Sequence, residues 1–400
     1  MQKNMFFIAV LLFFTAACQE EERSIKEAEL TKFTWKTAQK INATFITAID
    51  TLSSHIKNGD YGYIDELFIA KQDSVLYHEK FKLDYTLISK DKKGKMGCGS
   101  NMCTDSSVIH LYNYYHPKYH PFYLDSEMHT LQSVTKSVAS TIVGAAIENG
   151  QLTSVETPLF PFFEEGQLSD TIANHFKKAT IEDVLTMQLG LKWAEFGMSL
   201  EMETDVSAME LSEDWVAYTL NRSIIAPPGD QWNYNSGASQ LLSHIIKQVA
   251  NENIEEYGDR VLFQKLGISD YYWKKTPTGL SDTEGGLYLK AGDLAKIGLL
   301  YLQDGIWNEE RILPDDWVEN ALGKQVTDIY QDGGKEGYGY QWWITGDEPP
   351  LAVGLGYGNQ ILVIVPEENI VGVVYAWNVF DNEAKYIFRD FVDVLMSLKD

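Results

Sequence analysis

Strand-forming segments occur near both ends of this chain, and mostly helix-forming segments fill the stretch between them. Residues 64–81, IDELFIAKQDSVLYHEKF, are typical of two strands around the turn KQDS. Near the C-terminus, NQILVIV and IVGVVYAW flank PEEN as a second hairpin. Helical periodicity covers about 32–55 and 382–398. One sheet built from both chain ends, carrying the terminal helices and an inserted helical part, satisfies this order.

A serine and a lysine lie three positions apart in LQSVTKSVAS, residues 131–140. If Ser133 opens a helix that runs to Asn149 and stops at Gly150, Ser133 and Lys136 share one face of it. Burial and the helix N-terminus would keep the lysine neutral, and a neutral lysine can take the proton of a serine nucleophile. The alternative is that Ser133 caps the helix and Lys136 extends to water. The Ser133–Lys136 spacing alone does not distinguish a catalytic pair from a capping serine with an exposed lysine.

Other segments follow this pair in a recognisable order. They are TIEDVLTMQLGLKW at 180–193, PPGDQWNYNSGASQLL at 227–242, and GLGYGNQ at 354–360. Together with HTLQSVTKSVASTIVGAAIENGQL they resemble the serine β-lactamase-like and penicillin-binding-protein superfamily, and its class C-like esterase and amidase branch best. The resemblance runs from about Ile64 to the C-terminus. It implies a β-lactamase/DD-peptidase-like fold, α/β (α+β), with an antiparallel sheet flanked by helices and an all-helical lobe at about 133–282.

The resemblance also implies a function and roles for individual residues. Ser133 would attack an ester or amide carbonyl, and Lys136 and Tyr234 would share the proton transfers. Backbone N–H groups of Ser133 and Tyr357 would hold the oxyanion. We therefore expect a serine hydrolase that acts on a small ester, amide or peptide through an acyl-enzyme, with no metal or organic cofactor. Without the resemblance, Tyr234 could be a packed aromatic residue, and the glycines at 354–358 could mark a turn or bulge.

Two departures from the family pattern bear on the substrate. The usual Tyr-x-Asn reads Tyr234-Asn235-Ser236, and glycines replace the usual Lys-Thr-Gly at 354–360. β-Lactam antibiotics would lose contacts to both positions, so we expect better cleavage of short-chain esters or neutral amides. A D-alanyl peptidase-type cell-wall enzyme and a catalytically silent scaffold with this fold remain alternatives. A Ser-His-Asp triad has no Gly-x-Ser-x-Gly turn to support it, and the last histidine is His244.

The N-terminus carries an export signal. MQKNMFFIAVLLFFTAAC has a basic Lys3 and then an apolar run from Met5 to Ala17, too short for a good membrane-spanning helix. Small residues before Cys18 resemble a lipoprotein signal, with Cys18 as the lipidated residue. We expect residues 1–18 to be this signal and the protein to be lipid-anchored in the cell envelope. An ordinary secretory peptide with a bystander cysteine is the alternative.

The charged segment that follows is expected to be a tether over residues 19–31, before a hydrolase domain over 32–400. Its acidic run Glu20–Glu22 resembles a surface-export tag of some Bacteroidetes-type lipoproteins, although a plain solvated tether also explains it. The formal net charge of the whole chain is -24. A field of that sign repels nucleic acid, so we expect no nucleic-acid partner.

A long irregular insert is predicted at about residues 84–128. Its Gly-rich loop GKMGCGSNMCTD holds Cys98 and Cys103, which outside the cytoplasm suggest a disulfide that staples a turn. Aromatic residues of the insert could wall the cleft or simply pack the loop. Four histidines invite a metal site, but their Pro- and Tyr-rich setting and lack of helical spacing favour an ordered surface insert. They are His110, His116, His120 and His129.

Overall fold

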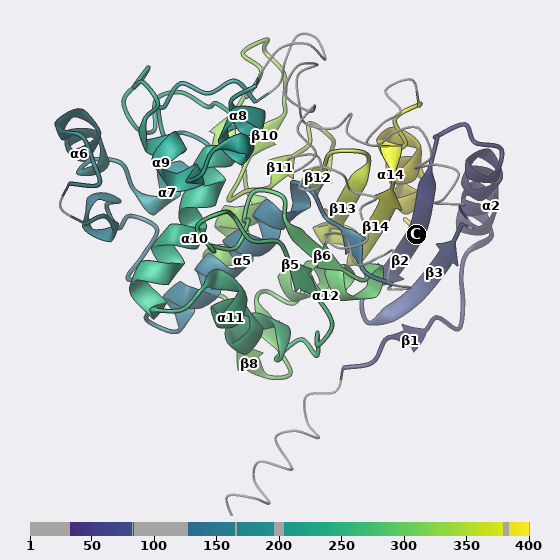
Figure 1. Ribbon diagram of the computed structural model, residues 1–400. Coiled ribbons are helices and arrows are strands. Elements are labelled where there is room, and N and C mark those ends of the chain that lie inside the picture. The colour runs from purple at the N-terminus through teal and green to yellow at the C-terminus, as the bar shows by residue number, and fades with distance from the viewer. Residues whose placement is uncertain are drawn as a thin grey trace, which may run out of the picture.

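A nine-stranded sheet is the main element of the computed structural model, which describes residues 33–81, 83, 127–164, 166–195, 204–378 and 384–399. The strand order is β1-β3-β2-β14-β13-β12-β11-β10-β9. The hairpin of β2 (Ile64–Lys71) and β3 (Ser74–Lys80) pairs through β2 with β14 (Ile370–Ala376). Strands from the two ends of the chain therefore lie side by side, as the purple and yellow arrows show (Figure 1). This confirms the predicted sheet and both predicted hairpins.

The remaining strands complete this sheet and two small ones. The large sheet also holds β1 (Lys36–Thr37), β9 (Val326–Thr327), β10 (Gly337–Tyr338), β11 (Trp343–Ile344), β12 (Ala352–Gly356) and β13 (Gln360–Val365). A three-stranded sheet joins β4 (His129–Thr130), β5 (Tyr272–Trp273) and β6 (Leu287–Leu289), and β7 (Ile306–Trp307) pairs with β8 (Glu310–Arg311). All pairs are antiparallel except β1 with β3.

Both faces of the central strands are buried, which explains their continuous apolar runs. Along β13, Ile361, Val363 and Val365 join the core beneath α2 (Ala43–Lys57) and α14 (Phe388–Met396). The alternate residues Leu362 and Ile364 join the core that holds α5 (Val134–Glu148) and α12 (Ala291–Leu302). The side chains of successive strand residues point to opposite faces, so one short segment serves both cores.

A helical lobe lies beside the sheet and appears in teal in Figure 1. Helix α5 carries Ser133 at its start, and every residue from Val134 to Ala146 is buried. The lobe and the sheet thus enclose this helix on all sides. The other helical elements are η2 (Phe160–Phe162), α6 (Asp170–Phe176), α7 (Ile181–Leu185), α8 (Asp205–Leu211), α9 (Trp215–Leu220), α10 (Ser236–Ala250), α11 (Ile254–Gly258), the π-helical η3 (Asp259–Phe263), α13 (Trp317–Leu322) and η4 (Pro366–Glu368).

Two helix starts differ from the prediction. The first helix begins only at Ala43, where the Asn42 side chain accepts a hydrogen bond from the N–H of Phe45 and so caps it (2.7 Å). The C-terminal helix begins at Phe388 rather than near residue 382. In α12, Asp293 lies inside the first turn and pairs with Lys296, while Lys290 occupies the cap position.

Several predicted features lie outside the described residues. They are the signal and tether at 1–31 with Cys18, the disulfide of Cys98 with Cys103, and most of the insert. These stay predictions. Within the described part of the chain, no helix is both long and apolar enough to cross a bilayer.

Candidate active site

A strained turn presents Ser133 at the end of β4. Gln132, which directly precedes it, has the positive φ of 48° that non-glycine residues seldom adopt. Its side-chain amide donates to the hydroxyl oxygen of Thr130 (2.9 Å), and the N–H of Leu131 donates to the carbonyl of Leu287 on β6 (2.9 Å). The turn is therefore held at both ends, and it delivers Ser133 half-buried to the first turn of α5.

Ser133 and Lys136 form a direct contact. The Lys136 ammonium donates to Ser133 Oγ at 3.0 Å and to the backbone carbonyl of Glu284 at 2.7 Å. Ser133 makes no side-chain capping bond, and Lys136 is 1% exposed. The alternative of a capping serine and a solvent-directed lysine is therefore wrong.

The charge state of Lys136 differs from the expectation. Burial lowers its pKa, but the surrounding acidic groups outweigh burial and raise the pKa above its ordinary value. Tyr234 contributes to this rise once it is ionised, and Glu284, Glu195 and Asp282 contribute as carboxylates. Lys136 is therefore an ammonium in the resting site. The predicted neutral lysine is wrong because the sequence motif does not include these carboxylates.

Tyr234 lies against the same pair, in the loop that leads into α10. Its hydroxyl hydrogen-bonds to Ser133 and Lys136, and its ring stacks on Trp343 with centroids 5.2 Å apart. Burial raises the pKa of Tyr234, while the Lys136 charge lowers it. The structure thus brings Ser133, Lys136 and Tyr234 together from two segments about a hundred residues apart.

The two residues after Tyr234 serve the protein itself. The Asn235 side chain caps α10 by accepting from the N–H of Ala238 (2.8 Å). Ser236, which stands where the family has asparagine, donates its hydroxyl to the carboxylate of Glu195 (2.6 Å). Each of the two side chains thus has a partner within the protein.

Strand β12 passes close to the Ser133 turn at two glycines. A Cβ on Gly356 would lie 2.4 Å from the Leu131 carbonyl oxygen, and one on Gly354 would lie 3.0 Å from a methyl group of Val134. Tyr357 follows directly, with a half-exposed side chain. Among the described residues, the backbone N–H groups of Ser133 and Tyr357 make no turn, loop or cap hydrogen bond to another backbone group. Both N–H groups belong to the segments that meet at this close approach of strand and turn.

Buried acidic residues around Lys136 are a part of the site that the sequence did not predict. Burial raises the pKa of Glu195, and it raises that of Asp282 to about 6. Glu210 and Glu284 lie beside them, each under 9% exposed. No local motif marks these residues, because they come from three separate loops and helices. These residues stand out because acidic side chains are seldom buried, and their burial can be seen only in the folded structure.

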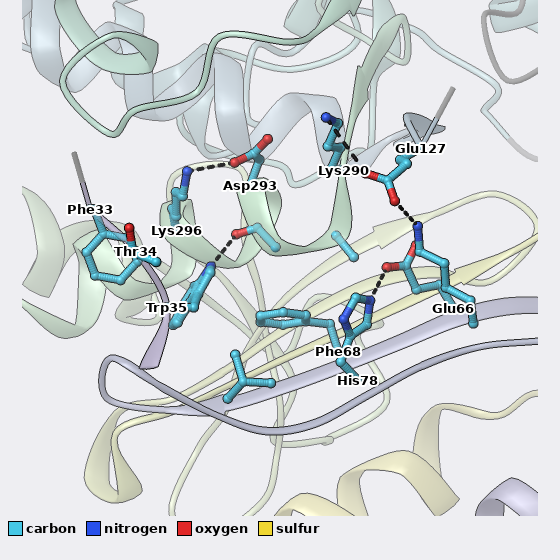
Figure 2. Close-up of a pocket in the computed structure, with 14 residues that line it drawn as sticks. Phe33, Thr34, Trp35, Glu66, Phe68, His78, Glu127, Lys290, Asp293 and Lys296 are labelled. Carbon is cyan, nitrogen blue, oxygen red and sulfur yellow. Dashed lines mark hydrogen bonds and ion pairs between the residues drawn. The ribbon is translucent and has the colours of Figure 1, made fainter. Parts of the chain in front are cut away.

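A cavity of about 400 Å³ lies elsewhere, between strands β2 and β3 and the start of α12 (Figure 2). Trp35 and Phe68 lie along it, and its charged side chains pair with one another. Examples are Glu66 with His78 (2.6 Å) and Lys296 with Asp293 (2.7 Å). Ser133 does not line this cavity, so we do not assign the active site to it.

A metal site formed by histidines was the alternative for the insert. The described residues contain no group of three or more His, Cys, Asp or Glu side chains able to hold a metal ion. Of the four histidines, only His129 is described. Its ring stacks on Tyr375 (centroids 4.7 Å apart) and lies tilted against Trp377 (4.0 Å), and burial lowers its pKa to about 3.

Comparisons with known proteins agree with this geometry. The sequence model of the Beta-lactamase family matches residues 100–390. The 6-aminohexanoate-dimer hydrolase of Paenarthrobacter ureafaciens is 25% identical over 298 residues, which cover 69% of this chain and 73% of that protein.

Solved structures share the fold at lower identity. A Bacillus anthracis protein assigned to the 6-aminohexanoate-dimer hydrolases has a TM-score of 0.65 at 20% identity, covering 86% of this chain and 80% of that one. A penicillin-binding protein from Bacillus halodurans has a TM-score of 0.58 at 16% identity, covering 86% and 99%.

Proposed function

Because the chain belongs to the beta-lactamase family of hydrolases, we propose that it is a serine hydrolase that cleaves an ester or amide through an acyl-enzyme on Ser133. The observation that carries the proposal is the 3.0 Å contact between Ser133 Oγ and a lysine amine that is 1% exposed. A buried lysine on a serine hydroxyl has little structural purpose, since burying an ammonium costs free energy. It does have a chemical one, because a serine nucleophile must lose its proton as it attacks.

The reaction follows from the three side chains. The Lys136–Tyr234 pair first releases one proton, since both groups rest in their protonated forms. Ser133 Oγ then attacks the carbonyl carbon, and the serine proton passes to that pair. The N–H groups of Ser133 and Tyr357 donate to the new oxyanion. Tyr234 returns the proton to the departing oxygen or nitrogen, which leaves an acyl group on Ser133. Water repeats the steps in reverse order and frees the acid.

The surroundings of the site favour a neutral substrate. Residues 354–360 include no lysine or arginine, so this motif offers no cation to a substrate carboxylate. Trp232 and Trp343 lie within 6.4 Å of the Tyr234 ring, centroid to centroid. Aromatic side chains at this place would pack against apolar substrate groups. The similarity to a 6-aminohexanoate-dimer hydrolase supports an amide as well as an ester.

We also propose where the enzyme acts. The lipoprotein-like signal at 1–18, with Cys18 as the lipidated residue, would place the catalytic domain on a membrane outside the cytoplasm. The charged tether at 19–31 would then separate the domain from the bilayer.

A fluorophosphonate probe tests the proposed function. The probe should label the wild-type protein by forming a bond from Ser133 Oγ to phosphorus with loss of fluoride. Ser133→Ala should abolish labelling. Ser140→Ala is the matched control, because it removes the same hydroxyl two turns along α5, where it donates only to the carbonyl of Tyr340 (2.8 Å). Folded wild-type protein that takes no label would favour the catalytically silent scaffold. Release of D-alanine from a D-Ala-D-Ala peptide would favour a cell-wall peptidase.

A further inference from the structure

A short loop brings a carboxylate to the far side of Lys136. Residues 281–285 are fixed to α10 by Gln240, whose side chain accepts from the N–H of Thr283 (3.0 Å) and donates to the carbonyl of Ser281 (3.0 Å). The same loop directs both the carbonyl and the side chain of Glu284 at Lys136. Glu284 Oε2 lies 3.5 Å from Lys136 Nζ, and Glu284 is 6% exposed.

Asp282 fixes the backbone of this loop. Its Oδ1 accepts from the N–H groups of Glu284 (3.1 Å) and Gly285 (2.9 Å), and its Oδ2 lies 3.7 Å from the ammonium of Lys274. A Cβ at Gly286 would lie 2.5 Å from that of Asp282, so only glycine permits this close fold. Glu284 is therefore held in place from its backbone outward.

Glu284 also has a carboxyl partner. Glu210 on α8 hydrogen-bonds to it, and both side chains are buried. Two buried carboxyl groups can share a hydrogen bond only if one keeps a proton. Burial and the charge of Glu284 raise the pKa of Glu210 well above its ordinary value. Glu210 therefore holds a proton, and the side chain of Glu284 is the one of the two that faces Lys136 Nζ, at 3.5 Å.

We propose that Glu284 is a positioning residue that keeps the Lys136 amine charged in the resting enzyme and aims it at Ser133, with Glu210 as its proton-bearing partner. This inference rests on the proposed function, because the charge of Lys136 matters to the rate only if Ser133 is the nucleophile. Glu284 then sets the pH at which the enzyme becomes active. The fewer negative charges surround Lys136, the lower the pH at which the Lys136–Tyr234 pair gives up a proton.

The test is the pH profile of kcat/KM for an aryl ester. Wild-type activity should rise with pH as the pair loses its proton. Glu284→Gln keeps the shape and the backbone carbonyl but removes the charge, so the rising limb should move to lower pH by about 1–3 units. Glu284→Asp keeps the charge but holds it farther from Lys136. Its rising limb should therefore lie between those of the wild type and Glu284→Gln. Removing the charge of Glu284 also lowers the pKa of Glu210, Glu195 and Asp282, because Glu284 raises all three. Their ionisation would offset part of the change, so the movement of the limb is a lower bound on the effect of Glu284.

Glu210→Gln is the matched control. Its amide N–H can donate to Glu284 as the protonated carboxyl does, so the limb should stay in place. Glu284→Gln losing activity equally at every pH would overturn the proposal and assign Glu284 a purely structural role. Glu210→Gln moving the limb as far as Glu284→Gln would also overturn it, since Glu210 would then be the charged member. If Glu284→Gln does not fold, an unmoved limb in Glu284→Asp is the contradicting result.

A second readout separates this inference from the proposed function. The amine of Lys136 can be titrated by NMR in protein with ¹³C at lysine Cε, on a Ser133→Ala background that has no catalysis. Its midpoint should drop in Glu284→Gln by the same interval as the rate profile. If the fluorophosphonate never labels Ser133 while this midpoint still moves, the nucleophile assignment is wrong and the role of Glu284 stands. An unmoved midpoint refutes the role of Glu284 whatever the probe shows.

Discussion

Replacing Gly356 with alanine should remove catalysis while the fold survives. The added Cβ would lie 2.4 Å from the carbonyl oxygen of Leu131, whereas ordinary contact begins at 3.4 Å. Strand β12 and the Ser133 turn must therefore separate by roughly 1 Å, and a misplacement of that size can cost about 10²-fold in rate. Losing one oxyanion donor costs about 10²–10³ in kcat. We expect a fall of about 10²-fold or more in kcat for Gly356→Ala.

The assay is hydrolysis of p-nitrophenyl acetate, measured beside thermal unfolding. Gly298→Ala is the matched control, because its Cβ would lie 2.8 Å from Val371 in the core between α12 and the sheet. Such overpacking costs typically 1–3 kcal/mol of stability. Gly298→Ala should lower the Tm and keep kcat. Wild-type kcat in folded Gly356→Ala, or an equal loss of kcat in both variants, would refute the role of the β12 approach.

Three more predictions concern the base, the substrate and the anchor. Lys136→Arg should lose about 10²–10⁴-fold in kcat/KM, because arginine cannot give up a proton in proteins; arginine working nearly as well as lysine would contradict this. Short-chain aryl esters or neutral amides should be cleaved far faster than a chromogenic cephalosporin, since a missing charge-assisted hydrogen bond costs roughly 1.5–3 kcal/mol, about ten- to hundredfold. The kcat/KM ratio on one preparation, with Ser133→Ala as the blank, measures it, and faster cephalosporin turnover would mean that another cation meets the carboxylate. Cys18→Ala should release the protein from the membrane fraction of expressing cells; equal membrane binding would argue against a lipid anchor.

Local patterns were enough to predict most of the fold. The β2–β3 and β13–β14 hairpins follow from short apolar runs around polar turns, and α5 follows from its periodicity and the stop at Gly150. The first helix start was misjudged because Phe33 continues the apolar pattern. In the structure Phe33 instead packs on Trp35 (5.1 Å) and Trp307 (4.8 Å), which are contacts that a local pattern cannot reveal.

The sequence predicted which side chains meet at the site, but it did not predict their charge states. Spacing brought Ser133 and Lys136 together, and the family order added Tyr234. The charge of Lys136 depends on Glu195, Glu284 and their neighbours, which are 59 and 148 positions away in the chain. A pKa is set by everything within several ångströms, so only the folded arrangement could correct the neutral lysine.

The most direct test is to find the acyl group. The enzyme should be mixed with a p-nitrophenyl ester, stopped in acid within the first turnover, digested and analysed by mass spectrometry. The account predicts the mass of the acyl group on the peptide that contains Ser133, and no acylated peptide in Ser133→Ala. An acyl group on another residue would contradict it, as would Ser133→Ala protein that hydrolyses the ester at the wild-type rate.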